Sequence, residues 1–189
     1  MFYNHTTDFA QFNTALTPAP ALAAHCTLSG ETMVETQQGW VAARTLRAGD
    51  ALATLDGGFA PISAITKPDI TNAMVHIPGG ALSNCSDVVL PGDVHVGLEL
   101  PAHVSDAPMV TAPLSALCGW RGIRPTFAGS SELATLQFDT EELIYAQTGL
   151  LIHAAPIGET FFERLNYGET RAKITLLQAR LGQPDTIAA

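Results

Sequence analysis

Cys26 is the residue whose type and position could do chemistry on the chain itself. The thiol of a cysteine lies within reach of the carbonyl of the residue before it, and such tethering can be worth an effective molarity of ~10⁵ M or more. Cysteine is intrinsically nucleophilic and is activated by a nearby base or a lowered pKa. Attack on a peptide bond would also require a donor that polarises the bond, a proton shuttle and a second nucleophile. The alternative for Cys26 is a small buried hydrophobe at the start of a strand, which is the role of most free cysteines.

The stretch that begins at Cys26 contains a series of short motifs in a characteristic order. They are Cys26-Thr27-Leu28-Ser29-Gly30-Glu31, Val34-Glu35-Thr36, Gly39-Trp40-Val41 and Leu46-Arg47-Ala48-Gly49-Asp50. The stretch resembles the N-terminal block of the Hint (Hedgehog/intein) fold, a compact β-domain whose first cysteine attacks the peptide bond on its N-terminal side. The resemblance implies that the scissile bond is His25–Cys26 and that the N-terminal segment of the chain itself is the substrate.

A second segment, residues 77–84 continuing through 87–96, resembles the second block of bacterial Hint domains of the Hedgehog-like branch. In the family this block carries Ser or Thr and then His, whose side chains activate the scissile amide. With Pro91 aligned to the proline common there, Leu90 occupies the Ser/Thr position and Asp93 the His position. An ionised carboxylate cannot donate a hydrogen bond to the leaving amine, and an unperturbed Asp is about three pKa units too acidic to shuttle protons near neutrality.

His95 could replace the missing histidine of the second block. It lies two positions after Asp93 and would share the face of Asp93 on a regular strand. The alternative is a histidine that is satisfied at the surface or in the core and takes no part in chemistry.

A third segment, residues 142–154, resembles the C-terminal end of an intein. His153 matches the penultimate histidine of inteins, but Ala154 replaces the asparagine whose amide cyclises to release the C-terminal side. The resemblance therefore implies that complete protein splicing is impossible. Hedgehog-like members need no terminal asparagine, because water or an external nucleophile resolves their thioester, so the loss of the asparagine does not by itself prevent cleavage at the N-terminal bond. The upstream histidine of this block maps to Glu141 or Glu142, and the alternative role for His153 is a polar cap on a closing strand.

Composition excludes several classes of partner and cofactor. Lys and Arg number 9 against 18 Asp and Glu, which gives a net charge of −9 at pH 7. Nucleic acids and anionic membrane surfaces repel acidic proteins, so neither is an expected partner. The three cysteines, Cys26, Cys85 and Cys118, have the spacing of neither a zinc site nor a disulfide framework. No metal is expected, and no glycine-rich motif indicates a nucleotide cofactor.

The N-terminus lacks the basic start and the apolar run of a secretory signal. No stretch is long and apolar enough to span a bilayer. The sequence predicts a cytoplasmic protein, or one that is exported without an N-terminal signal peptide.

The chain divides into three predicted parts. Residues 1–25 form an N-terminal arm with a short helix and a Pro/Ala linker, residues 26–156 form the Hint-like domain, and residues 157–189 form a C-terminal extension. A helix is expected over 170–181, because Gly182 and Pro184 follow it as stop signals. Asp56-Gly57-Gly58 favours a hairpin turn. Many short apolar runs between turn residues predict an all-β, compact Hint-like domain. The expected strands are 32–36, 39–42, 51–55, 60–66, 74–77, 87–90, 95–98, 109–111, 132–138, 143–146 and 150–153.

Two functions of different class follow from these residues. One is a Hint-like domain with slow or absent cleavage at His25–Cys26, which serves as a structural or binding module through its arm or its C-terminal helix. The other is a competent autoprocessing domain, in which Cys26 makes an N-to-S acyl shift, with Asp93, His95 and His153 as the candidate site residues. In a third arrangement the β-domain belongs to a larger bacterial assembly, in which the arm and the helix bind neighbouring proteins.

Overall fold

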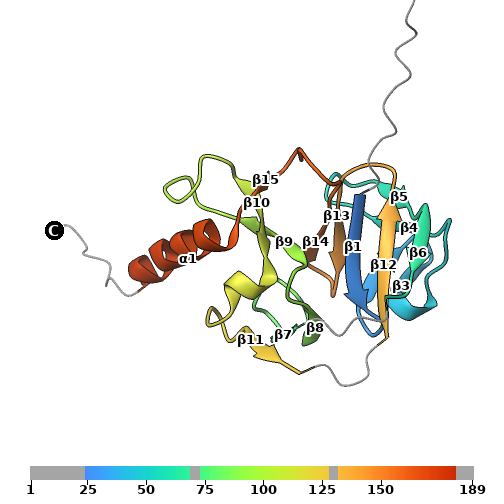
Figure 1. Ribbon diagram of the computed structural model, residues 1–189, viewed down its shortest axis with the longest axis horizontal. Helices are drawn as coiled ribbons and strands as arrows, with labels where there is room; N and C mark the ends of the chain where they lie inside the picture. The colour runs from blue at the N-terminus through green and yellow to red at the C-terminus, as the bar shows by residue number, and fades with distance from the viewer. Residues whose placement is uncertain (1–23, 69–72, 128–131, 182–189) are drawn as a thin grey trace, which may run out of the picture.

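The computed structural model describes residues 24–68, 73–127 and 132–181. These residues form short β-strands in three sheets and one α-helix at the C-terminal end (Figure 1). The predicted all-β class with a C-terminal helix is therefore confirmed. The predicted N-terminal arm, with its short helix, lies outside the described residues.

The first sheet carries the candidate nucleophile. Its strands are β1 (Ala24–Ser29), β12 (Leu133–Phe138) and β6 (Ala64–Thr66), and β1 pairs with β12 in antiparallel register, with Cys26 opposite Leu136. Successive side chains of a strand point to opposite faces, so Cys26 and Leu28 are buried whereas His25 is exposed. The alternation places Cys26 inward and the residue before it at the surface.

A second, nine-stranded sheet forms the body of the molecule. Along it, neighbouring strands run β15, β10, β9, β14, β13, β2, β4 and β5, and β3 pairs with β2 at the side. Their bounds are β2 Met33–Thr36, β3 Gly39–Ala42, β4 Ala51–Ala53, β5 Phe59–Pro61, β9 His95–Glu99, β10 Met109–Pro113, β13 Glu142–Ala146, β14 Leu150–Ala154 and β15 Glu163–Arg164. The order brings β14 beside β9, which places the ends of the second and third sequence blocks next to each other.

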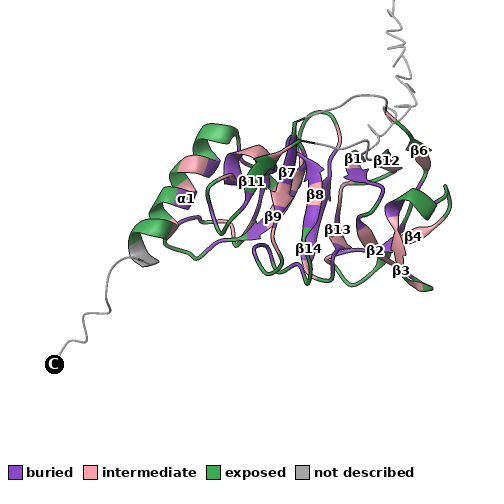
Figure 2. Ribbon diagram, turned by 90° about the horizontal axis from the view of Figure 1, so that it is seen from below, coloured by how far each residue is buried: buried purple, intermediate pink, exposed green. Residues whose placement is uncertain are grey.

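The third sheet consists of β11 (Arg124–Thr126), β7 (Met74–Ile77) and β8 (Val88–Pro91). Two short 3₁₀ helices, η1 (Ala43–Thr45) and η2 (Leu114–Leu117), connect strands. Buried residues concentrate in the strands, whereas the helix is exposed over most of its surface (Figure 2).

Helix α1 (Tyr167–Leu181) begins three residues before the predicted start at residue 170. The reason is a reciprocal cap: Asn166 Oδ1 accepts from the Glu169 N–H at 2.9 Å, and Glu169 Oε2 accepts from the Asn166 N–H at 2.8 Å. The helix packs on η2, where Arg171 donates to the carbonyl oxygens of Ala116 and Cys118 at 3.2 and 2.9 Å. The C-terminal helix is thereby fastened to the β-structure.

The predicted strands agree with the observed ones to within one or two residues except in one region. The predicted strand 60–66 is wrong as a single element, because β5 and β6 lie in different sheets. Strands β1, β11 and β15 were not among the expected strands. The predicted hairpin is confirmed: β4 and β5 pair antiparallel, and Gly57 adopts a φ of 80° in the turn between them.

Candidate active site

A pocket of about 580 Å³ brings the predicted site residues together. It is bounded by β1, the start of β9, the end of β14 and the chain that follows β14. Its lining residues are His25, Cys26, Thr27, Asp93, Val94, His95, Pro113, Ser115, His153, Ala155, Pro156, Ile157, Gly158 and Arg164. Residues from all three sequence blocks therefore face one cavity.

The candidate scissile bond lies inside a hydrogen-bonded strand. The His25 N–H donates to the Ala155 carbonyl at 3.0 Å, and the Ala155 N–H donates to the His25 carbonyl at 3.3 Å. The carbonyl that Cys26 would attack therefore already accepts a backbone hydrogen bond, from the residue that directly follows the third block. A backbone donor so placed can polarise the carbonyl, which is the role of an oxyanion hole.

The Cys26 thiol is buried, with 5% of the residue exposed. Burial raises the pKa of the Cys26 thiol to about 12, because a thiolate loses its hydration in apolar surroundings. With a pKa of about 12, only about one thiol in 10⁵ is ionised at neutral pH. In this conformation Cys26 is a weak nucleophile.

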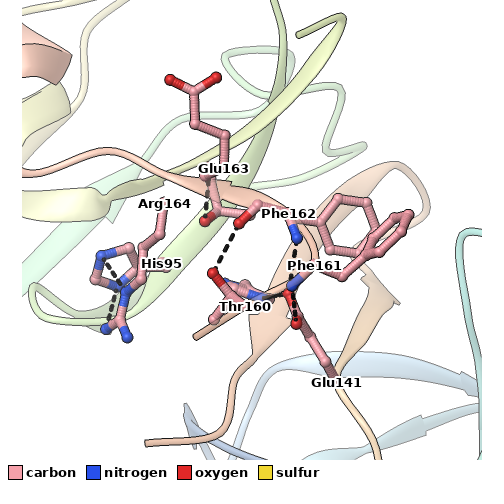
Figure 3. A network of polar contacts seen from close by, with 9 residues as sticks. His95, Glu141, Thr160, Phe161, Phe162, Glu163 and Arg164 are labelled. Atoms are coloured by element: carbon pink, nitrogen blue, oxygen red, sulfur yellow. Dashed lines mark hydrogen bonds and ion pairs between the residues drawn. The ribbon is translucent and has the colours of Figure 1, made fainter. Parts of the chain in front are cut away.

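His95 lies at the start of β9, where Arg164 holds it (Figure 3). Arg164 Nε donates to His95 Nε2 at 3.1 Å, so the imidazole proton resides on Nδ1, which donates to the Asp93 carbonyl at 3.2 Å. Burial first, and then the positive charge of Arg164, lower the pKa of His95 to about 4. His95 is therefore neutral near pH 7, with both ring nitrogens engaged.

His153 is paired with Glu141. His153 Nε2 donates to Glu141 Oε1 at 2.7 Å, and its ring packs edge-on against Phe162 with centroids 6.0 Å apart. Burial lowers the pKa of His153, although the Glu141 carboxylate opposes that shift. The other ring nitrogen, Nδ1, is buried and has no hydrogen-bond partner among the residues that the structure describes. A neutral imidazole with a free Nδ1 lone pair could accept a proton.

The second block is placed differently from the sequence expectation. Asp93 lies in a turn, where the Val94 N–H donates to the Pro91 carbonyl at 3.2 Å, and the strand begins only at His95. The expectation that Asp93 and His95 share one face of a regular strand is therefore wrong, although both line the pocket. Leu90 is fully buried in the core and does not line the pocket.

The sequence did not predict a role for three groups that the structure places in or beside the site. Arg164 gave no local signal, because its contact with His95 spans 69 residues of chain. The Ala155 N–H is a backbone group, which residue types do not reveal. Glu141 was considered only as one of two positions for a lost histidine. The structure distinguishes the two, because Glu141 contacts His153 whereas Glu142 accepts from the Thr140 hydroxyl.

The described part of the chain contains no group of three or more His, Cys, Asp or Glu side chains that could hold a metal ion. Within the same residues, no helix has the length and apolar character needed to cross a membrane.

The sequence matches no family model and no curated protein. Among solved structures, it is similar to a bacterial intein-like domain from Clostridium thermocellum, with 14% identity over 67% of this chain and 97% of that chain and a TM-score of 0.49. It is also similar to the gp41-1 intein, with 15% identity over 67% of this chain and 98% of that chain and a TM-score of 0.48. The Msm DnaB1 intein splicing domain, solved with zinc bound, has 17% identity over 67% of this chain and 98% of that chain and a TM-score of 0.46.

Proposed function

We propose that this chain is a Hint-like domain with degenerate second and third blocks, in which cleavage at His25–Cys26 is slow or absent and the scaffold serves as a structural or binding module. The observation that carries the proposal is the burial of Cys26, whose thiol pKa is raised to about 12 beside the bond that it would attack. Every cysteine-dependent route begins with loss of that thiol proton.

Two of the surrounding groups, His95 and Asp93, do not compensate for the unreactive thiol. His95 is neutral and bonded to Arg164, so it can neither donate a proton from Nε2 nor accept one there without breaking that contact. Asp93 occupies the position of the family's histidine but can only accept hydrogen bonds when ionised. Each missing proton-transfer or polarising group costs about 10²–10⁴ in rate, so two losses slow a reaction of minutes to one of weeks or longer.

A competent autoprocessing domain is the second candidate, and the hydrogen bond from the Ala155 N–H to the His25 carbonyl favours it. In that reaction the Cys26 sulfur bonds to the His25 carbonyl carbon, the C–N bond breaks, and the Cys26 nitrogen takes up a proton. The product is a thioester, which water or an external nucleophile then resolves. Full splicing is not part of either candidate, because Ala154 has no side-chain amide to cyclise.

For a binding module, two regions of the chain are candidates for contact with a partner protein. We propose protein partners for the N-terminal arm (residues 1–25) or for the C-terminal extension that contains α1. The net charge of −9 argues against a nucleic acid in either place.

The two candidates are separated by the intact mass of the purified full chain after incubation with hydroxylamine, which cleaves thioesters. Wild type is compared with Cys26→Ala, and Cys85→Ala is the matched control because Cys85 is exposed and does not line the pocket. The proposal expects the full-length mass in all three proteins. Loss of the mass of residues 1–25 in wild type and Cys85→Ala, but not in Cys26→Ala, would replace it with the autoprocessing candidate.

A further inference from the structure

The chain that follows β14 folds back over the candidate active site. After Ala154 it contributes Ala155, Pro156, Ile157 and Gly158 to the pocket wall. It then returns as β15, which runs parallel to β10, and the Leu165 N–H donates to the Thr111 carbonyl at 2.8 Å. We call residues 155–164 the strap.

The strap is anchored at its centre by the Glu141 carboxylate (Figure 3). Glu141 Oε2 accepts from the Phe161 N–H at 2.6 Å, and Oε1 accepts from the Phe162 N–H at 3.1 Å and from His153 at 2.7 Å. The Thr160 hydroxyl donates to the Phe162 carbonyl at 2.8 Å and tightens the same turn. A single carboxylate, 11% exposed, therefore joins the strap to His153.

The end of the strap reaches His95. Arg164 Nε lies 3.1 Å from His95 Nε2, and the second guanidinium nitrogen, Nη2, lies 3.4 Å from His95 Nδ1. Two other titratable groups act on His95: His153 opposes its protonation and Asp93 favours it. Of the three groups that act on the His95 imidazole, Arg164 is the one with a permanent positive charge. Arg164 is also the one that belongs to the strap.

We propose that the strap is an autoinhibitory element and that Arg164 is a positioning residue, which locks His95 in its Nδ1–H tautomer and keeps its Nε2 from exchanging protons with the cleavage site. This inference rests on the proposed function, because it adds a second cause of slow cleavage to the burial of Cys26: the imidazole that would take the thiol proton is occupied by Arg164. Once Arg164 is withdrawn, His95 Nε2 accepts the Cys26 thiol proton and the sulfur attacks the His25 carbonyl carbon. As the C–N bond breaks, the protonated His95 returns the proton to the Cys26 nitrogen. Hydroxylamine then takes the acyl group from sulfur and restores the thiol.

The test compares Arg164→Ala and Arg164→Gln with Arg47→Ala in the full chain. Arg47 is a matched control because it is an exposed arginine that does not line the pocket. Two quantities are measured for each protein: the midpoint of the His95 titration by NMR, and the rate of hydroxylamine cleavage by intact mass. Thermal unfolding verifies that each variant is folded.

If Arg164 locks His95, both Arg164 variants raise the midpoint of the His95 titration from about 4 toward the ordinary value of 6.5. Both variants also cleave about 100-fold faster than Arg47→Ala, which is the lower end of the rate gain that a positioned acid or base contributes. The added cleavage disappears in the double variant Cys26→Ala/Arg164→Ala. An unchanged midpoint, or a raised midpoint with unchanged cleavage, overturns the lock and leaves the proposed slow cleavage intact. Rapid loss of the mass of residues 1–25 from the wild type, absent in Cys26→Ala, overturns the proposed function itself, so the two failures are distinguishable.

Discussion

The backbones of His25 and Ala155 are joined by reciprocal hydrogen bonds, with N–O distances of 3.0 and 3.3 Å. The region between Cys26 and Ala154 therefore begins and ends at the same place, on the pocket that also contains His95 and His153. The candidate scissile bond lies in a paired strand, and its carbonyl accepts a hydrogen bond from the Ala155 N–H. The chain that follows Ala154 forms part of the pocket wall. The Cys26 thiol beside this bond is buried, and burial raises its pKa to about 12.

Asp93→His tests the alignment of the second block. Asp93 is exposed and lines the pocket, so a histidine there would supply the proton donor that the resemblance to Hint domains implies for this position. We expect hydroxylamine cleavage to rise about 10²-fold, measured by intact mass. Asp106→His, at an exposed acidic position that does not line the pocket, is the control. Equal rates in the two variants would show that the alignment is wrong.

The stability of the protein should fall as the pH drops from about 7 to about 5.5. The pKa of His95 is lowered from 6.5 to about 4, and burial also lowers the pKa of His153. The unfolded chain therefore binds more protons than the folded chain below about pH 6.5, so this contribution is present above that pH and is lost toward pH 4. Urea unfolding at the two pH values measures the loss, and His95→Asn should reduce it. The same loss in His95→Asn would contradict the assignment to His95.

Asn166→Ala should lower the free energy of unfolding by about 1 kcal/mol, because an N-cap side chain satisfies a helix N–H. The Asn166 side chain accepts from the Glu169 N–H at 2.9 Å at the start of α1. Urea denaturation measures the change. Gln178→Ala, at an exposed position within the helix, is the control and should change stability by less than about 0.5 kcal/mol. Comparable losses in both variants would argue against the cap.

Gly149→Ala should destabilise the fold by about 2 kcal/mol or more. A Cβ at Gly149 would lie 2.5 Å from the Ser83 carbonyl oxygen, a backbone atom that cannot move aside alone. Gly79→Ala is the control, since its Cβ would meet its nearest atom at 3.4 Å, which is ordinary contact. Chemical denaturation compares the two. A Gly149→Ala protein as stable as Gly79→Ala would mean that the β13–β14 turn is packed differently.

The sequence was sufficient to predict what depends on local pattern. Turn residues and apolar runs located most strands and the β4–β5 hairpin. The resemblance selected Cys26, Asp93 and His153, which meet in one pocket with His95, although His95 was chosen from a strand spacing that the structure does not have. The split of the predicted strand 60–66 depends on which sheet each half joins, and strand propensity does not determine that. The Arg164–His95 contact depends on the strap returning beside β10, a long-range pairing that no short window of sequence encodes.

The reactivity of the Cys26 thiol in the folded protein distinguishes slow from competent cleavage, because every cysteine-dependent route passes through its thiolate. The measurement is alkylation by iodoacetamide at about pH 8, with the modified cysteines identified by peptide mass mapping. Cys85 is exposed, and hydrogen bonding with Thr148 and Ser86 lowers its pKa, so it serves as the internal reference. We expect rapid modification of Cys85 and modification of Cys26 only after unfolding. Modification of Cys26 in the native protein at a rate comparable to that of Cys85 would contradict this expectation.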